Sequence, residues 1–285
     1  MVMRAAQILV VLALVLGALS GTVRAHGDFH TLVTEANKLI DSMPIDPEGW
    51  LKRGELYRLH QQWDAAAADF EKAATLGAKQ AALDLAWGRF WLDTNWPLST
   101  RVAMDRLLAA SPNHVEGHLL RGRALTRLGQ HLEAAADFTK AIASTAEPGP
   151  DLFIERAQIL SAGGPQEFAA ALATLDEGIK KLGPLVTLQL TAIDLELKRK
   201  NFEAALERLD GVAAKSPRKE TWLVRRAEVL MQANRPDEAR KAYRDALASM
   251  QTLPPARRNV PAMVDLEKRI QKELQFLDGP GPVKP

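Results

Sequence analysis

The chain has 285 residues, of which 47% are hydrophobic, so it is long enough to bury a substantial core in one large or two ordinary domains. It carries 37 basic and 35 acidic residues, and this near balance argues against a nucleic-acid-binding protein, which needs a concentrated basic surface. It contains no cysteine, which excludes a disulfide framework, a thiolate zinc site and a cysteine nucleophile.

The first 25 residues have the layout of a secretory signal peptide. Arg4 gives a positive start, the segment from Ile8 to Leu19 is apolar, and the segment ending at Ala25 supplies small or modest side chains for a signal peptidase. The apolar segment is short for a membrane-spanning helix. We predict cleavage after Ala25 and a periplasmic or secreted protein. The alternative is an uncleaved helix that anchors the chain in a membrane, which would be its only membrane contact.

Two histidines, His26 and His30, follow this segment directly. If cleavage follows Ala25, the free amine and the imidazole of His26 would chelate copper(II), with His30 as a third nitrogen ligand. The plainer interpretation is that they lead into an amphipathic N-terminal capping helix within 26–46. In that helix Asp28 would be the N-cap and Phe29 would open the apolar stripe.

A repeated pattern begins at residue 47. Counted from there, small residues stand at positions 8 and 20 and larger apolar ones at 4, 11 and 24; the first copy has Trp50, Gly54, Tyr57, Ala66, Phe70 and Ala73. A step of 34 residues from Gly54 reaches Gly88, and a second step reaches Gly122. This pattern closely resembles the tetratricopeptide repeat. It predicts six repeats, at 47–80, 81–114, 115–148, 149–185, 186–219 and 220–253.

Each repeat holds two segments with apolar residues at helical spacing, and its small residues allow the two helices to approach closely. One helical pair cannot bury its apolar face alone, so neighbouring pairs must stack and the ends need caps. We therefore predict an all-α, tetratricopeptide-type solenoid, wound as a right-handed superhelix. A C-terminal cap at 254–277, with a charged helix from Pro261 to Phe276, and a disordered tail at 278–285 would complete it.

The resemblance implies a scaffold whose first helices line a concave groove for a protein or peptide. Positions 5 and 9 face the groove in this family, and position 5 is apolar in every repeat. The predicted groove residues are Leu51, Glu55, Leu85, Arg89, Leu119, Arg123, Arg127, Asp194 and Glu228. The family's clamp for a terminal carboxylate needs Lys at position 5 and Asn at position 9, and no repeat here has either. The three arginines either bind an anionic partner or form ion pairs with Asp93 and Glu116.

Aromatic residues and histidines within the repeats have mostly structural interpretations. By the repeat register, Trp87 and Trp91 belong to the core, whereas Trp96 lies in a turn and is expected to be exposed. His114 and His118 have a spacing that would suit a metal, but they straddle a turn and no third ligand is identifiable, so a structural role is favoured. His60 and His131 are expected to be solvent-facing turn residues.

No catalytic or nucleotide-binding motif occurs in the chain. The sequence therefore predicts an exported, non-enzymatic scaffold that needs no cofactor and binds a protein or peptide. The alternative is a copper-binding or copper-delivery protein that uses His26 and His30.

Overall fold

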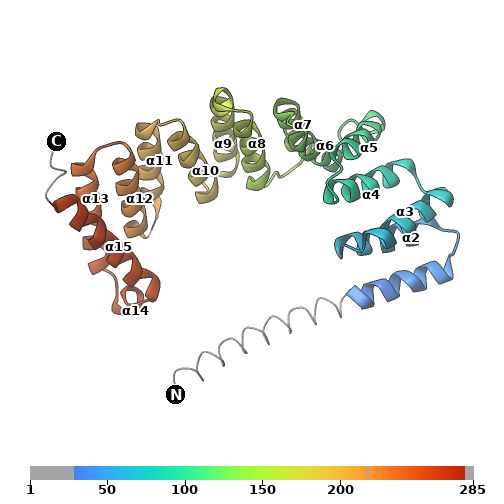
Figure 1. Ribbon diagram of the computed structural model, residues 1–285, viewed down its shortest axis with the longest axis horizontal. Coiled ribbons are helices and arrows are strands. Elements are labelled where there is room, and N and C mark those ends of the chain that lie inside the picture. The colour runs from blue at the N-terminus through green and yellow to red at the C-terminus, as the bar shows by residue number, and fades with distance from the viewer. Residues whose placement is uncertain (1–28, 217, 280–285) are drawn as a thin grey trace, which may run out of the picture. The chain divides into compact units, whose positions relative to one another are not determined.

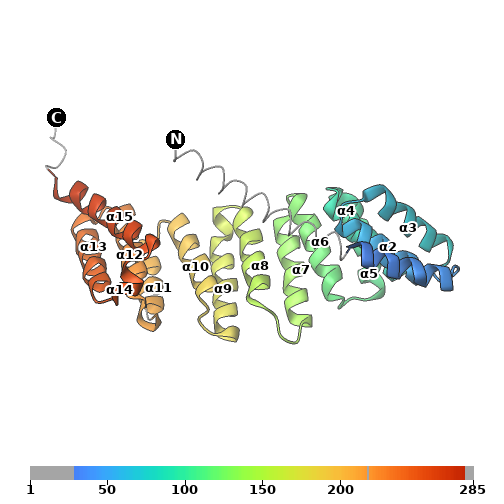
Figure 2. The ribbon, with the colours of Figure 1, turned by 90° about the horizontal axis from the view of Figure 1, so that it is seen from below.

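The computed structural model describes residues 29–216 and 218–279, and this part of the chain contains helices and no strands. The chain divides into two compact units, Met1–Leu128 and Gly129–Pro285. Consecutive helices pack as pairs within each unit, for example α4 with α5 and α8 with α9 (Figure 1). Figure 2 shows the pairing of α8 and α9 from below. The prediction of an all-α, tetratricopeptide-type fold is confirmed.

The first unit begins with helical residues 29–42. It continues with α2 (Pro47–Leu59), α3 (Trp63–Thr75), α4 (Gln80–Asp93), α5 (Pro97–Ala110) and α6 (Val115–Arg127). The second unit contains α7 (His131–Ser144), α8 (Pro150–Ala162), the short 3₁₀ helix η1 (Pro165–Glu167), α9 (Phe168–Leu182), α10 (Val186–Lys198), α11 (Phe202–Lys215), α12 (Lys219–Gln232), α13 (Pro236–Gln251), α14 (Pro255–Arg258) and α15 (Pro261–Asp278). Each of the six predicted repeat ranges contains two long helices.

Small residues bring the two helices of a pair together. In the first pair, Gly54 on α2 faces the ring of Phe70 on α3, and a Cβ placed on Gly54 would lie 2.5 Å from Phe70 Cε1. Phe70 and Ala66 are fully buried. The alanines at the equivalent close-contact position of later pairs are also fully buried: Ala134, Ala171, Ala205 and Ala239. Close approach at these positions explains why the sequence repeats small residues there.

The turn inside each pair reverses the chain through one residue with a positive φ. That residue is position 15 in five repeats, namely Gln61, Asn95, Gly129, Lys200 and Asn234, and position 16 in the fourth repeat, Gly164. Glycine adopts this conformation freely and asparagine tolerates it, whereas glutamine and lysine are strained there. In the fourth repeat the short helix η1 follows Gly164 directly, before α9 begins at Phe168.

Both ends of the repeats are covered by helix. At the N-terminal end, helix 29–42 buries Phe29, Ala36 and Ile40, as its apolar stripe predicts. His60 is exposed, but its ring centroid lies 3.8 Å from that of Phe29, so it packs on the cap as well as facing solvent. Asp28, the predicted N-cap, lies outside the described residues.

The C-terminal cap predicted at 254–277 contains the expected helix from Pro261 and, before it, a short helix that was not predicted. α14 ends at Arg258 and α15 begins at Pro261. A proline restricts the residue before it to extended backbone, and Val260 has a ψ of 144°. Asp278 belongs to α15 and not to the predicted tail.

Candidate interaction surface

The predicted groove positions of the first unit lie on α2, α4 and α6. Leu51, Leu85 and Leu119 are half-buried. Leu51 and Leu85 also pack against clusters of fully buried side chains, so only part of each leucine remains for a partner. Position 5 of the sixth repeat, Val224, is 2% exposed, and the expectation that this row offers apolar surface in every repeat is therefore wrong there.

A chain of alternating charges connects these three helices. On α4, the Arg89 guanidinium donates from Nε and Nη2 to the two carboxylate oxygens of Glu116, at 2.6 Å each. Its Nη1 donates to Glu55 Oε1 at 3.1 Å. Glu55 accepts from Arg58 Nε at 2.8 Å, and Arg58 also pairs with Asp93. Five side chains thus form one ion-pair network across α2, α4 and α6.

The network shifts the titration of its central pair. The hydrogen bonds to Glu116 raise the pKa of Arg89, and the Arg89 guanidinium holds the pKa of Glu116 below its ordinary value. Arg89 is thus already paired with acidic side chains of the protein, as the ion-pair interpretation expects, and is not free to bind an anionic partner. The sequence analysis named Glu116 as a possible ion-pair partner, but residue spacing alone could not decide which arginine it contacts.

The other predicted arginines of this unit lie on α6. Arg127 is exposed, and its Nη1 donates to the backbone carbonyl of Leu92 on α4. Arg123 is half-buried. Because Leu92 and Asp93 are adjacent, the Arg127 contact lies beside the end of the charge network and adds a further link between α4 and α6.

In the second unit, the two predicted acidic residues share one arginine that the sequence analysis missed. Arg225 on α12 donates to Asp194 on α10 at 2.8 Å and to Glu228 at 3.4 Å. Arg269 on α15 also donates to Glu228, at 2.9 Å. The spacing of Arg225 one helical turn before Glu228 was the available signal.

The aromatic residues divide as predicted. The rings of Trp87 and Trp91 stack with centroids 5.1 Å apart, and both side chains pack against the core of the first unit. Trp96 is 64% exposed. Leu98 and Val102, on the first turns of α5, are also exposed and were not singled out from the sequence.

The histidines at the start of α6 have structural roles. His114 caps the helix, with Nδ1 accepting from the Gly117 N–H at 3.1 Å. His118 is 2% exposed, and its Nε2 lies 2.8 Å from the Pro112 carbonyl oxygen. His131 opens α7 and is half-buried, not fully solvent-facing.

The copper hypothesis depends on residues at the edge of the described part. His26 lies outside it, and His30 is an exposed residue of helix 29–42. Within residues 29–216 and 218–279, no three His, Asp or Glu side chains gather closely enough to hold a metal ion. The copper site therefore remains a prediction from the sequence. In the same residues, no helix combines the length and the apolar character needed to cross a bilayer.

Within each unit, helical pairs that pack through small residues and are joined by ion pairs between successive first helices define an α-helical repeat protein. Residues 101–150 and 190–254 match the family model of the tetratricopeptide repeat. These residues are similar to the tetratricopeptide-repeat family. No curated protein matches it.

Several solved structures share the fold. The C-terminal part of a tetratricopeptide-repeat protein from Cytophaga hutchinsonii is 16% identical with a TM-score of 0.61, and the match covers 85% of this chain and 95% of that one. PilW, a type IV pilus biogenesis factor, is 21% identical with a TM-score of 0.56, over 70% of this chain and 92% of PilW. A tetratricopeptide-repeat protein from Parabacteroides merdae is 14% identical with a TM-score of 0.52, over 86% and 93%. At these identities the likeness concerns the fold alone.

Proposed function

We propose that the protein is an exported, non-enzymatic scaffold that binds a partner polypeptide along the first helices of its repeats. Tetratricopeptide-repeat proteins act in protein–protein interaction. In this protein we assign partner binding to the face formed by α2, α4 and α6. The observation that carries it is the Arg89 bridge. It holds the three helices in one register, and a surface that is ordered before binding loses less conformational entropy when a partner docks.

The chemistry of this face suits a partner with apolar and acidic side chains. Leu85 on α4 and Leu119 on α6 are half-buried and offer part of their surface, and Arg127 adds an exposed positive charge at the end of α6. The charges of Arg89 are already matched by Glu55 and Glu116. We expect Arg127, and not Arg89, to contribute to the orientation of the partner.

Site-specific photocrosslinking tests this face. A photoreactive amino acid at Arg127 is compared with one at Val102, which is 49% exposed and lies on α5, a second helix of its repeat. We expect the probe at 127 to capture a defined polypeptide that the probe at 102 does not, with mass spectrometry identifying it. Capture of the same proteins from both positions would contradict a role for the first-helix face.

Export rests on the pattern of residues 1–25. N-terminal sequencing of the protein from the exported fraction should give a mature chain that begins at His26. A chain that keeps Met1 and sediments with membranes would contradict cleavage and support the N-terminal anchor instead.

A further inference from the structure

A second surface lies at the far end of the chain, around the break between α14 and α15. A cavity of about 420 Å³ opens there, within the size range of small-ligand sites. Its lining comes from the start of α12, the end of α13, α14 and the start of α15: Arg218, Glu220, Leu253, Ala256, Arg257, Val260 and Met263. Most of this lining is apolar, and the charged groups come from three side chains only.

The charges at this cavity do not cancel. Glu220 is 1% exposed and accepts from Arg218 Nε at 3.0 Å, so these two side chains neutralise each other. Arg218 Nη2 also donates to Met263 Sδ at 3.8 Å, which holds the Arg218 guanidinium against the wall. The backbone N–H of Arg257 donates to the Pro254 carbonyl oxygen at 2.8 Å, whereas its exposed guanidinium makes no hydrogen bond or ion pair within the described part of the chain. Arg257 is therefore the charged group of this cavity that has no opposite charge paired with it, and the apolar side chains Leu253, Val260 and Met263 make up most of the remaining lining.

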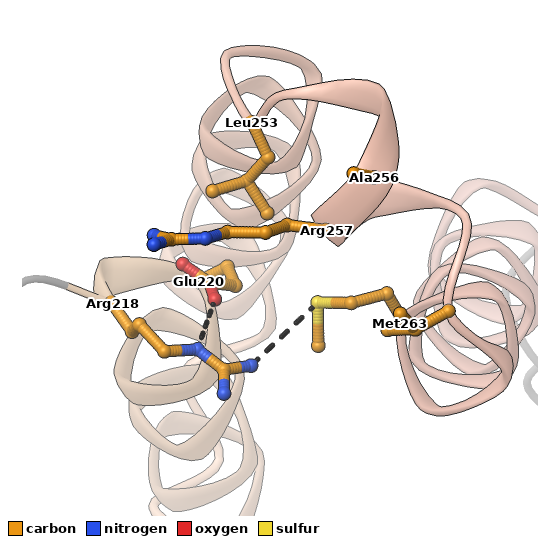
Figure 3. A pocket seen from close by; sticks show the side chains of 7 residues that line it. Arg218, Glu220, Leu253, Ala256, Arg257 and Met263 are labelled. Carbon is orange, nitrogen blue, oxygen red and sulfur yellow. Dashed lines mark hydrogen bonds and ion pairs between the residues drawn. The ribbon is translucent and has the colours of Figure 1, made fainter.

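Figure 3 shows how the groups lie. Arg257 extends over Glu220, Arg218 approaches Glu220 from the other side, and Met263 faces both arginines. The helix that starts beside them, α12, has no side-chain cap at its N-terminus, and neither has α15, which starts at Val260 and Pro261.

We propose that this cavity binds an aliphatic carboxylate, with the apolar group on Leu253, Val260 and Met263 and the carboxylate on Arg257. A planar guanidinium without a protein partner matches a carboxylate by two parallel hydrogen bonds. The apolar floor supplies the affinity that one exposed ion pair lacks. The site lies on α12–α15. A negative result for carboxylate binding would therefore not affect the proposed role of α2, α4 and α6 in partner binding.

The test follows the methyl group of Met263 in the full-length protein. The chain has 7 methionines, and ¹³C-methyl labelling with a Met263→Leu assignment variant isolates the signal at this site. N-acetyl-leucine is titrated in parallel with N-acetyl-leucinamide, which has the same apolar group without the charge. We expect the acid to shift Met263 with a dissociation constant on the order of 1 mM and to leave the buried Met104 signal unmoved.

Two arginine variants separate the charge from the fold. Arg257→Gln should weaken binding of N-acetyl-leucine about tenfold without changing the helical circular dichroism. Arg258→Gln is the matched control. Arg258 is adjacent to Arg257, but its Nη2 lies 3.9 Å from Glu267 Oε1, so this variant should leave binding unchanged. 4-Methylpentanoate distinguishes a free acid from a chain terminus: equal binding indicates that a small acid suffices, and selective binding of N-acetyl-leucine indicates a terminal residue. Equal binding of acid and amide, no shift of Met263, or an unchanged affinity in Arg257→Gln would overturn the proposal.

Discussion

At the scale of single residues, the two glycines at position 8 of the first two repeats face different neighbours. Gly54 faces the edge of the Phe70 ring, and Gly88 faces the terminal methyl of Met104. Both neighbours are fully buried, but a methionine side chain changes shape more easily than a ring held on all sides.

The substitutions Gly54→Ala and Gly88→Ala should therefore differ in their effect on stability. A Cβ on Gly54 forces the ring or the helices apart, at a cost of roughly 1–3 kcal/mol. At Gly88, Met104 can yield, and the gain of about 1 kcal/mol in helix propensity offsets most of the strain. Denaturant midpoints followed by circular dichroism measure both variants. Equal losses would mean that Met104 is as rigid as Phe70.

Glu116 predicts a pH dependence. Because Arg89 lowers its pKa in the folded protein, Glu116 contributes stability above its unfolded pKa of about 4.3, and this contribution disappears as the pH falls through the lower folded pKa. Its side chain is 41% exposed, so after solvent screening we expect only about 0.5–1 kcal/mol.

The comparison is between the wild-type protein and Glu116→Gln. The free energies of unfolding should differ at pH 7, and the difference should disappear as the pH falls through the lowered pKa of Glu116, because both side chains are then neutral. A difference that stays constant over this range would mean that the Arg89–Glu116 pair is not the cause.

At the scale of elements, the left-handed residue at position 15, or 16 in the fourth repeat, is the common feature of the turns. Lys200 has a φ of 58° between α10 and α11, and a lysine has no side-chain group that favours this conformation. Gly129 has a φ of 76° at the equivalent position, and a glycine has no conformational strain there.

Lys200→Gly should stabilise the protein by about 0.5–1 kcal/mol because the strain at φ 58° is removed. Lys198→Gly, two residues earlier within α10, is the control and should destabilise by a similar amount because glycine weakens a helix. Thermal unfolding of the two variants should shift in opposite directions. A loss of stability in Lys200→Gly would contradict the strain.

The helices of the repeats were predictable because close packing requires small residues at fixed spacing. In the first pair, Gly54 and Ala66 are these small residues. The start of the C-terminal helix was predictable from Pro261, whereas the four-residue helix α14 before it is too short to show an amphipathic pattern. The ion pairs of the candidate surface were the least predictable part. Arg89 had acids available on neighbouring helices, and only the geometry of α4 against α6 selects Glu116.

At the scale of the whole molecule, each unit contains clusters of buried apolar side chains. In the second unit one cluster extends from Ile193 to Ile270, and in the first unit clusters form around Phe70 and around Met104. In a repeat protein each pair of helices contacts only its neighbours, so damage should spread locally.

Leu209→Ala tests this locality. Leu209 is 1% exposed on α11, and its truncation should cost about 2–5 kcal/mol within that cluster. Hydrogen exchange should accelerate in α11 to α13 and stay unchanged in α2 to α5. Uniform acceleration along the chain would show that the two units unfold as one.

The Arg89 bridge also bears on the order of folding. It reaches 34 residues back to Glu55 and 27 forward to Glu116, so the first three repeats need only short loops to close. Low contact order of this kind gives fast folding without a long search for distant partners. No cysteine delays the process with a disulfide. A chain that leaves a ribosome or a translocation pore N-terminus first can thus assemble one repeat after another, in the order in which they emerge.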